Sequence, residues 1–191
     1  MGLLKDSYYV TQVLKGNVAA FAFLVDKHKD SIFNLAYRIT GNREDAEEIA
    51  QDAFLKAFQK LDTFRKQAKF STWLYRIAFN LAISKTRKKK TEITELNEKH
   101  FDQYILDDVR YEIMESDEED VIKMLHHAMD ELDTQELALT TLFYYEGKSI
   151  DDISEITGIT PGNVKVRLHR TRKKLYAILH RIMSTQEVYP T

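Results

Sequence analysis

The chain has 191 residues, a formal net charge of −2 and 43% hydrophobic residues, as in an ordinary soluble folded protein. It has no cysteine, which excludes disulfides, thiolate catalysis and cysteine-based metal sites. No run of about 18 apolar residues occurs and the N-terminus lacks a signal-peptide core, so we expect a cytoplasmic protein without membrane insertion. With 6 Gly and 2 Pro, and without alternating β-branched residues, the sequence predicts an all-α fold.

The N-terminal part predicts helices over 17–39, 43–61 and 71–87. Gly41 and Asn42 end the first of them. The second helix has an apolar face and, opposite to it, a polar face with one leucine. A leucine rimmed by acids suits a basic protein partner, although it can equally be an ordinary surface residue. The candidate protein-binding residues on this face are Glu48, Gln51, Asp52 and Leu55.

A basic block lies between Arg65 and Lys90, with nine Lys or Arg and no acid. The helix over 71–87 is expected to expose a mixed stripe on the side opposite its buried face. An Arg can bind a phosphate, an Asn can read a base edge and a Trp can stack on an unpaired base, a combination suited to single-stranded DNA. Alternatively, Trp73 and Phe79 complete the core, which we favour for Phe79. The expected stripe consists of Thr72, Trp73, Arg76, Asn80, Ile83 and Arg87.

An acidic segment separates two units of the chain. Residues 92–120 carry twelve Asp or Glu against two bases, and their apolar residues form no clear face. We interpret 91–120 as a linker between an N-terminal domain, 1–90, and a C-terminal domain, 121–191. The linker is either a solvated spacer or a strap that occupies a cationic channel.

Local signals predict a helix-turn-helix in the C-terminal domain. A capping box of Asp133 and Glu136 opens a helix that ends at Gly147, and Ser149 with Asp152 opens a short one. That short helix ends at Gly158. Thr160 and Pro161 then fit the N-cap and first position of a last helix.

The last helix is basic on its outer side. Seven Lys or Arg and no acid lie between Thr160 and Arg181, while Val164, Leu168 and Leu175 are expected to point inward. Its first turns would place some side chains at base edges in the major groove and others at the phosphates. A solvated helix face is the weaker alternative. The candidate DNA-binding residues are Asn163, Lys165, Val166, Arg167, His169, Arg170, Arg172 and Lys173.

Three stretches in this order resemble the extracytoplasmic-function (ECF) sigma factors of the sigma-70 family. "NREDAEEIAQDAFLKAFQKLDTF" is similar to region 2.2, "KFSTWLYRIAFNLAISKTRKKK" to regions 2.3 and 2.4, and "YYEGKSIDDISEITGITPGNVKVRLHRTRKKL" to region 4.2. The resemblance covers about 17–179. The chain departs from the family at Asp133, where a proline is common, and at His169, where base-reading side chains vary.

The resemblance implies a role for each candidate surface. Glu48, Gln51, Asp52 and Leu55 would bind the beta prime subunit of bacterial RNA polymerase, with beta as a further contact. The last helix would read the minus-thirty-five promoter element as duplex, and the linker would cross the active-site cleft. An anti-sigma factor is common in the family. The minus-ten element would be recognised and opened, with a base flipped near 65–69, by Phe64, Arg65, Lys66, Lys69, Trp73, Arg76, Asn80 and Arg87.

Two other classes of function compete with this interpretation. A free-standing helix-turn-helix regulator would bind palindromic duplex DNA without polymerase, but it has no use for the basic block at 65–90. A metal-dependent nuclease would need carboxylates such as Asp107 and Asp108, or Asp151 and Asp152. Neighbouring carboxylates on a helix point to different faces, so we expect no enzyme, no cofactor and no metal site.

Overall fold

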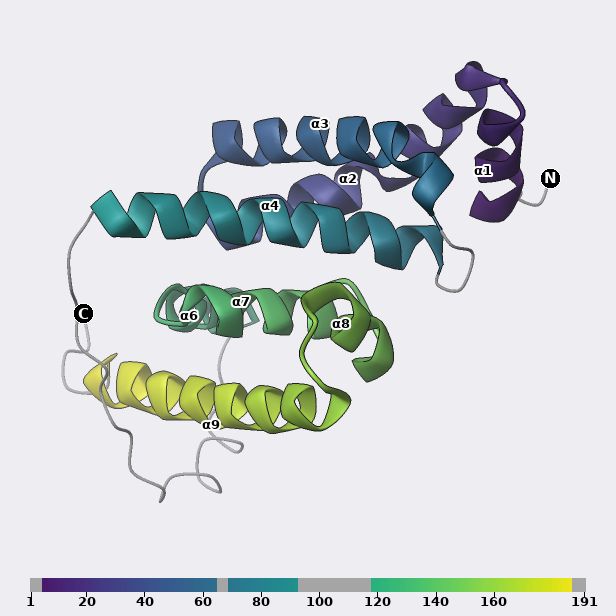
Figure 1. Ribbon diagram of the computed structural model, residues 1–191. Coiled ribbons are helices and arrows are strands. Elements are labelled where there is room, and N and C mark those ends of the chain that lie inside the picture. The colour runs from purple at the N-terminus through teal and green to yellow at the C-terminus, as the bar shows by residue number, and fades with distance from the viewer. Residues whose placement is uncertain (1–4, 65–68, 93–117, 187–191) are drawn as a thin grey trace.

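The computed structural model describes residues 5–64, 69–92 and 118–186, and every regular element in these ranges is helical (Figure 1). The all-α prediction is therefore confirmed. Within the described ranges, no helix is long and apolar enough to cross a membrane. Most of the expected acidic linker, 93–117, lies outside the described residues.

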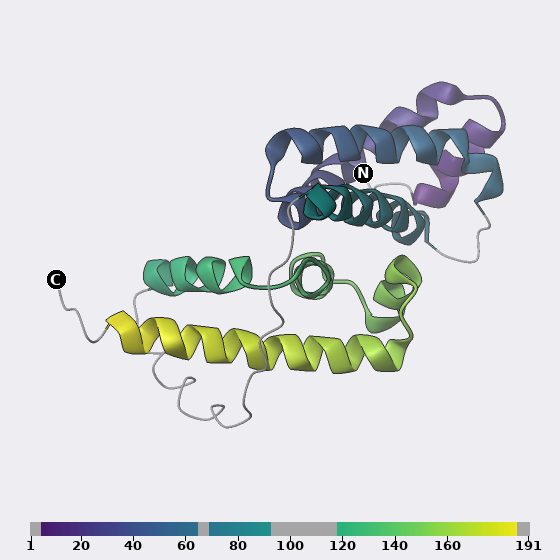
Figure 2. The same ribbon diagram turned by 60° about the vertical axis from the view of Figure 1, so that its left-hand side comes forward.

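The N-terminal helices form a bundle in which α2, α3 and α4 pack against one another (Figures 1 and 2). The three helices predicted from the sequence are present, although α2 starts later than expected and α4 runs further. The elements are α1 (Asp6–Leu14), the 3-10 turn η1 (Val18–Ala20), α2 (Phe21–Thr40), α3 (Arg43–Gln59), the 3-10 turn η2 (Leu61–Thr63) and α4 (Phe70–Glu92).

The first helix, α1, was not predicted, and two interactions attach it to α2. Val10 is fully buried in the core, and the carboxylate of Asp6 lies 2.6 Å from Lys27 Nζ and 3.0 Å from His28 Nε2. The hydrogen bond with His28, aided by the one with Lys27, outweighs burial and lowers the pKa of Asp6 to about 2. The sequence did not predict α1 because its nine residues are too few for a clear helical periodicity, and the contacts that hold it come from distant residues.

The C-terminal helices form the predicted helix-turn-helix and one further helix, α6. Asp133 and Glu136 make the full capping box, Ser149 caps the short helix, and Gly158 ends it at φ 76°. The helix after Asp133 changes to π-helical geometry in its last turn. The elements are α6 (Glu118–Asp130), α7 (Thr134–Thr140), the π-helical η3 (Thr141–Tyr145), α8 (Ile150–Thr157) and α9 (Pro161–Gln186).

One hydrophobic core extends through both units. Buried residues of α2, α3 and α4 belong to the same cluster as Leu139, Leu142, Ile153 and Ile156 of the C-terminal helices. α8 packs on α4, and Figure 2 shows α7 and α8 between α4 and α9. The expected exposure of Thr72 is wrong, because α8 covers this side of α4 and leaves Thr72 only 3% exposed.

Candidate functional site

The polar face of α3 is formed as predicted. Asn42 caps the helix by accepting a 2.8 Å hydrogen bond from the Asp45 N–H. Glu48 and Gln51 are exposed, as is Leu55 at 53%, whereas Asp52 is half-buried. Phe58, which was not predicted as part of this face, is 38% exposed and lies one turn after Leu55. Its i+3 spacing from Leu55 was the available signal.

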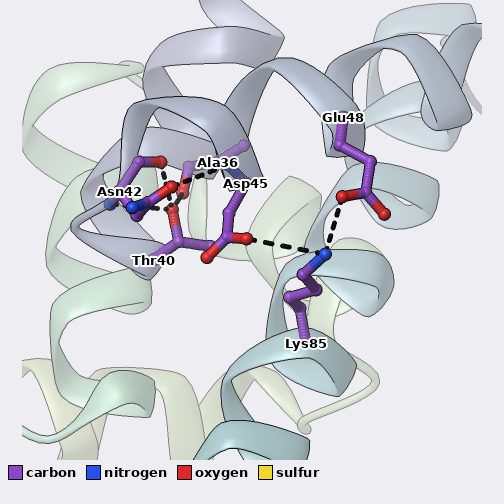
Figure 3. Close-up of polar contacts among 6 residues, drawn as sticks. All are labelled: Ala36, Thr40, Asn42, Asp45, Glu48 and Lys85. Atoms are coloured by element: carbon purple, nitrogen blue, oxygen red, sulfur yellow. Dashed lines mark hydrogen bonds and ion pairs between the residues drawn. The ribbon is translucent and has the colours of Figure 1, made fainter.

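A lysine from the basic block is held by this acidic face (Figure 3). Lys85 Nζ on α4 lies 2.7 Å from Glu48 Oε2 and 3.5 Å from Asp45 Oδ1 on α3. The hydrogen bond to Glu48 is the main cause of a raised pKa of Lys85. Thr40 at the end of α2 contacts the start of α3, since its hydroxyl accepts a 3.4 Å hydrogen bond from the Asn42 N–H. Lys85 therefore links the two helices, and its charge is partly neutralised.

The stripe on α4 is only partly exposed. Arg76, Asn80 and Arg87 are exposed, and the expected burial of Phe79 is confirmed at 9% exposure. Trp73 is half-buried, with its ring centre 5.1 Å from that of Phe64, in an aromatic group that also includes Phe70.

The loop that precedes α4 is described at one of its three candidate residues. Lys69 is exposed, and its Nζ lies 3.6 Å from Asp152 Oδ2 of the C-terminal unit. Arg65 and Lys66 lie outside the described residues.

The base-reading candidates on α9 lie on its outer side. Val164 and Leu168 are buried against the other C-terminal helices, as predicted, and Leu175 is half-buried. Val166 is 46% exposed. The other candidates are exposed except Lys173, which is half-buried; the exposed ones are Asn163, Lys165, Arg167, His169, Arg170 and Arg172.

Three cations of α9 are positioned by residues of α7 and η3. Arg167 donates to the Gln135 side chain at 2.6 Å, and Lys174 pairs with Glu136 at 2.6 Å. Arg172 Nε donates to the Tyr144 hydroxyl at 3.0 Å. Because these contacts fix the side chains, Arg167 and Arg172 would lose less conformational entropy on binding a phosphate.

The described residues hold no group of three or more His, Asp or Glu that could bind a metal. The carboxylate of Asp152 instead accepts hydrogen bonds from Ser149 and Thr72. Together with Lys69, these hydrogen bonds lower the pKa of Asp152 against the effect of its burial. The candidate binding surfaces of the described residues are therefore the basic sides of α4 and α9 and the acidic face of α3 around Leu55.

Sequence comparison relates both units to one family. Residues 24–92 match "Sigma-70 region 2" and residues 122–175 match "Sigma-70, region 4". The "ECF RNA polymerase sigma factor SigW" of Bacillus subtilis is 37% identical over 180 residues, covering 87% of this chain and 92% of the relative. The chain belongs to the ECF sigma factors. It therefore acts as an RNA polymerase sigma factor, directing transcription to promoters.

Further relatives agree with this assignment. The "RNA polymerase sigma-H factor" of Pseudomonas aeruginosa is 29% identical over 177 residues, covering 90% of this sigma factor and 92% of the relative. The fold is similar to CnrH in "Structure of CnrH in complex with the cytosolic domain of CnrY", with a TM-score of 0.65, 24% identity and coverage of 92% and 97% of the two chains. A second similar fold is "the sigma factor RpoE in complex with the anti-sigma factor NepR from Bartonella quintana", with a TM-score of 0.62, 23% identity and coverage of 84% and 96%.

Proposed function

We propose that this sigma factor binds core polymerase through the α3 face and promoter DNA through α4 and α9. The observation that carries the proposal is the separation of these surfaces: acids around exposed Leu55 on α3, and exposed bases on the other two helices. An acidic rim with an apolar centre suits a basic helical partner, for which the family implies the beta prime subunit. Phe58 extends the apolar centre.

The α4 surface is the proposed site of minus-ten recognition and strand opening. Arg76 and Arg87 would hold phosphates while Asn80 reads an unpaired base. Trp73 and Phe64 form an aromatic wall on which such a base can stack. Capture of a flipped base would offset an unstacking cost of a few kcal/mol, so no nucleotide hydrolysis is needed.

The α9 surface is the proposed site of minus-thirty-five recognition. Asn163, Lys165, Val166 and His169, which are exposed on the first turns of α9, would contact base edges, with Val166 against a thymine methyl group. The positioned Arg167 and Arg172 would contact the phosphates on either side. The phosphate contacts would fix the position of α9 on the duplex, whereas the base-edge contacts would give the sequence preference.

We further propose that 1–90 and 121–191 act as two domains joined by the acidic linker, in the cytoplasm where polymerase works. Six to ten phosphate contacts lose about 10³ to 10⁵ in affinity between 50 and 200 mM salt, so one small domain holds DNA weakly. Both domains on one polymerase would raise the effective concentration of each for its element. An anti-sigma factor, a partner that the names of similar proteins suggest, would act by blocking this assembly.

Run-off transcription with purified bacterial core polymerase, this protein and genomic fragments tests the proposal. We expect discrete transcripts only when both proteins are present. Leu55→Ala should weaken capture of core polymerase while leaving duplex binding intact, with exposed Lys15→Ala as a control outside the three surfaces. Specific binding to a palindromic duplex without polymerase, and no transcripts with it, would favour the free-standing regulator.

A further inference from the structure

We propose that the C-terminal helices hold a binding site for a small amphipathic anion, a carboxylate with an apolar chain, which is the chemistry of a free fatty acid. The site is a cavity of about 610 Å³ that is lined by residues of α6, α7, η3 and α9. This volume lies within the range of about 300–1,000 Å³ that is typical of small-molecule sites.

The floor of the cavity is apolar and buried. Met129 of α6, together with Leu168 and Leu179 of α9, lines the floor, and these residues are 5%, 4% and 8% exposed. Both α6 and α7 pack on α9, and both ribbon views show them along one side of it (Figures 1 and 2). An apolar chain placed here would leave water, which favours its binding.

One buried hydroxyl of the cavity wall has no partner. Thr140 is 4% exposed, and its Oγ1 makes no hydrogen bond within the described part of the chain. The hydroxyls of Thr40, Thr86 and Thr157 show the usual alternative, since each donates to the carbonyl four residues earlier in its helix. A buried hydroxyl without a partner is costly, so Thr140 is a donor that a ligand oxygen can use.

The helix changes its geometry next to this hydroxyl. The π-helical η3 follows Thr140 directly, and single π-helical turns are frequent at functional sites. η3 brings Tyr144 and Tyr145 to the rim of the cavity, where they are 52% and 41% exposed. The Tyr145 hydroxyl donates to Met129 Sδ at 3.4 Å, and a thioether is a weak acceptor. A carboxylate oxygen would be a stronger acceptor for this hydroxyl and for that of Thr140.

The rim of the cavity is positively charged. Among the described residues that line it, Arg172 is the only charged one. Its Nε donates to the Tyr144 hydroxyl at 3.0 Å, which leaves the proton of that hydroxyl and the terminal guanidinium N–H groups for an anion. The Arg38 guanidinium lies 3.6 Å from the centre of the Tyr145 ring and adds a second positive charge. Because a guanidinium binds a carboxylate through two parallel hydrogen bonds, this rim suits an anionic head on an apolar chain.

A bound carboxylate would affect DNA binding, a consequence that rests on the proposed function. Arg172 is a proposed phosphate contact of α9, and the ligand would compete with the phosphate for it. We expect saturating ligand to weaken binding of the upstream duplex roughly two- to five-fold, as for loss of one exposed ion pair. The slope of log affinity against log salt should become shallower by about 0.9.

Nuclear magnetic resonance of isotope-labelled methionine methyl groups in the full chain tests the site. The sequence has five methionines; Met129 lines the cavity, whereas Met183 of α9 does not. Decanoate, added below its micelle-forming concentration, should shift the Met129 signal saturably and leave that of Met183 unchanged. Acetate lacks the chain and decanol lacks the charge, so both should bind at least roughly ten-fold more weakly.

Substitutions test the two polar groups of the cavity. Thr140→Val replaces the hydroxyl with a methyl group of similar shape and should weaken decanoate binding roughly three-fold, whereas Arg172→Gln should weaken it roughly ten-fold. Neither change should alter the binding of decanol. Thr140→Ser keeps the hydroxyl and should retain the affinity, which covers the case that Thr140→Val disturbs the fold.

Thr141→Val is the matched control. The Thr141 hydroxyl is also buried and without a partner in the described part of the chain, but Thr141 does not line the cavity. Decanoate binding to this variant should therefore equal that of the unmodified protein. Equal losses in Thr140→Val and Thr141→Val would overturn the role of Thr140.

The outcomes separate the site from the proposed function. No saturable shift of Met129, or equal shifts of Met129 and Met183, would overturn the site. A saturable Met129 shift with unchanged duplex affinity would overturn the competition for Arg172 alone. Absence of duplex binding without any ligand would instead overturn the proposed function of α9 and leave the site intact.

Discussion

The two proposed DNA-facing helices differ in how the rest of the chain supports them. α9 packs on α7, and residues of α7 and η3 hold three of its cations by hydrogen bonds. α4 is packed on both sides, by α2 and α3 and by α8, and Lys85 and Lys69 of its basic block are paired with acids. The candidate base-reading residues of α9 therefore lie on one supported outer side, whereas α4 exposes Arg76, Asn80 and Arg87 but has other cations engaged by acids of the chain.

The largest expected effect concerns α9, the helix proposed to read duplex DNA. Lys165→Ala with His169→Ala removes two base-edge candidates, each worth about 1–3 kcal/mol, so binding to the upstream element should fall at least ten-fold. Fluorescence anisotropy with duplexes that carry either element measures it. Capture of core polymerase should match that of Lys15→Ala. A loss of polymerase capture would contradict the division of labour between α9 and α3.

Asn80→Ala tests the proposed role of α4 in strand opening. We expect promoter opening, followed by permanganate reactivity, to drop about ten-fold, the effect of about 1.4 kcal/mol. Initial binding should change much less, because Asn80 is proposed to contact a base only after it unpairs. Equal losses in both steps would mean that Asn80 serves duplex binding, which would remove the contrast between α4 and α9.

The attachment of α1 to α2 gives a pH-dependent prediction. Asp6 has a folded pKa of about 2, below its ordinary 3.8, so its stabilising effect is present above about pH 4 and is lost as the pH falls towards 2. At pH 7, Asp6→Asn should lower the free energy of unfolding by about 1 kcal/mol, after allowance for solvent screening. Denaturant titrations should show the difference vanishing near pH 2; a constant difference would exclude the ion pair as its cause.

The smallest expected effect concerns Lys85, which joins α4 to the polymerase-binding face. Lys85→Met should weaken capture of core polymerase about two- to three-fold, because Glu48 loses the contact that orients it, although exposed ion pairs contribute little. Glu48→Gln combined with Lys85→Met should be no worse than Glu48→Gln alone. Additive losses in this double-mutant cycle would show that the two residues act independently.

Local signals account for what the sequence could predict. The capping residues Asn42, Asp133 and Ser149, with Gly158 at positive φ, mark helix ends through contacts within a few residues. Helical periodicity was enough to place Leu55 outside and Val164 inside. The helix-turn-helix and the three N-terminal helices follow from these signals alone.

Contacts between distant segments account for what it could not. Helical periodicity places Thr72 on the face expected to be exposed. It is nevertheless buried, because α8 packs over it and Asp152, 80 residues later in the chain, accepts its hydrogen bond. Lys85 belongs to a run of bases and is nevertheless paired with acids of α3. Composition predicts a charged surface but does not show which charges are neutralised within the chain.

The spacing between the two promoter elements offers the most direct test that α4 and α9 act together on one polymerase. Once run-off transcription has identified a promoter, five base pairs, about half a helical turn, can be inserted between its elements. We predict that transcription with this sigma factor falls at least ten-fold, while binding of the isolated upstream duplex is unchanged. Transcription that is indifferent to the insertion would contradict the account.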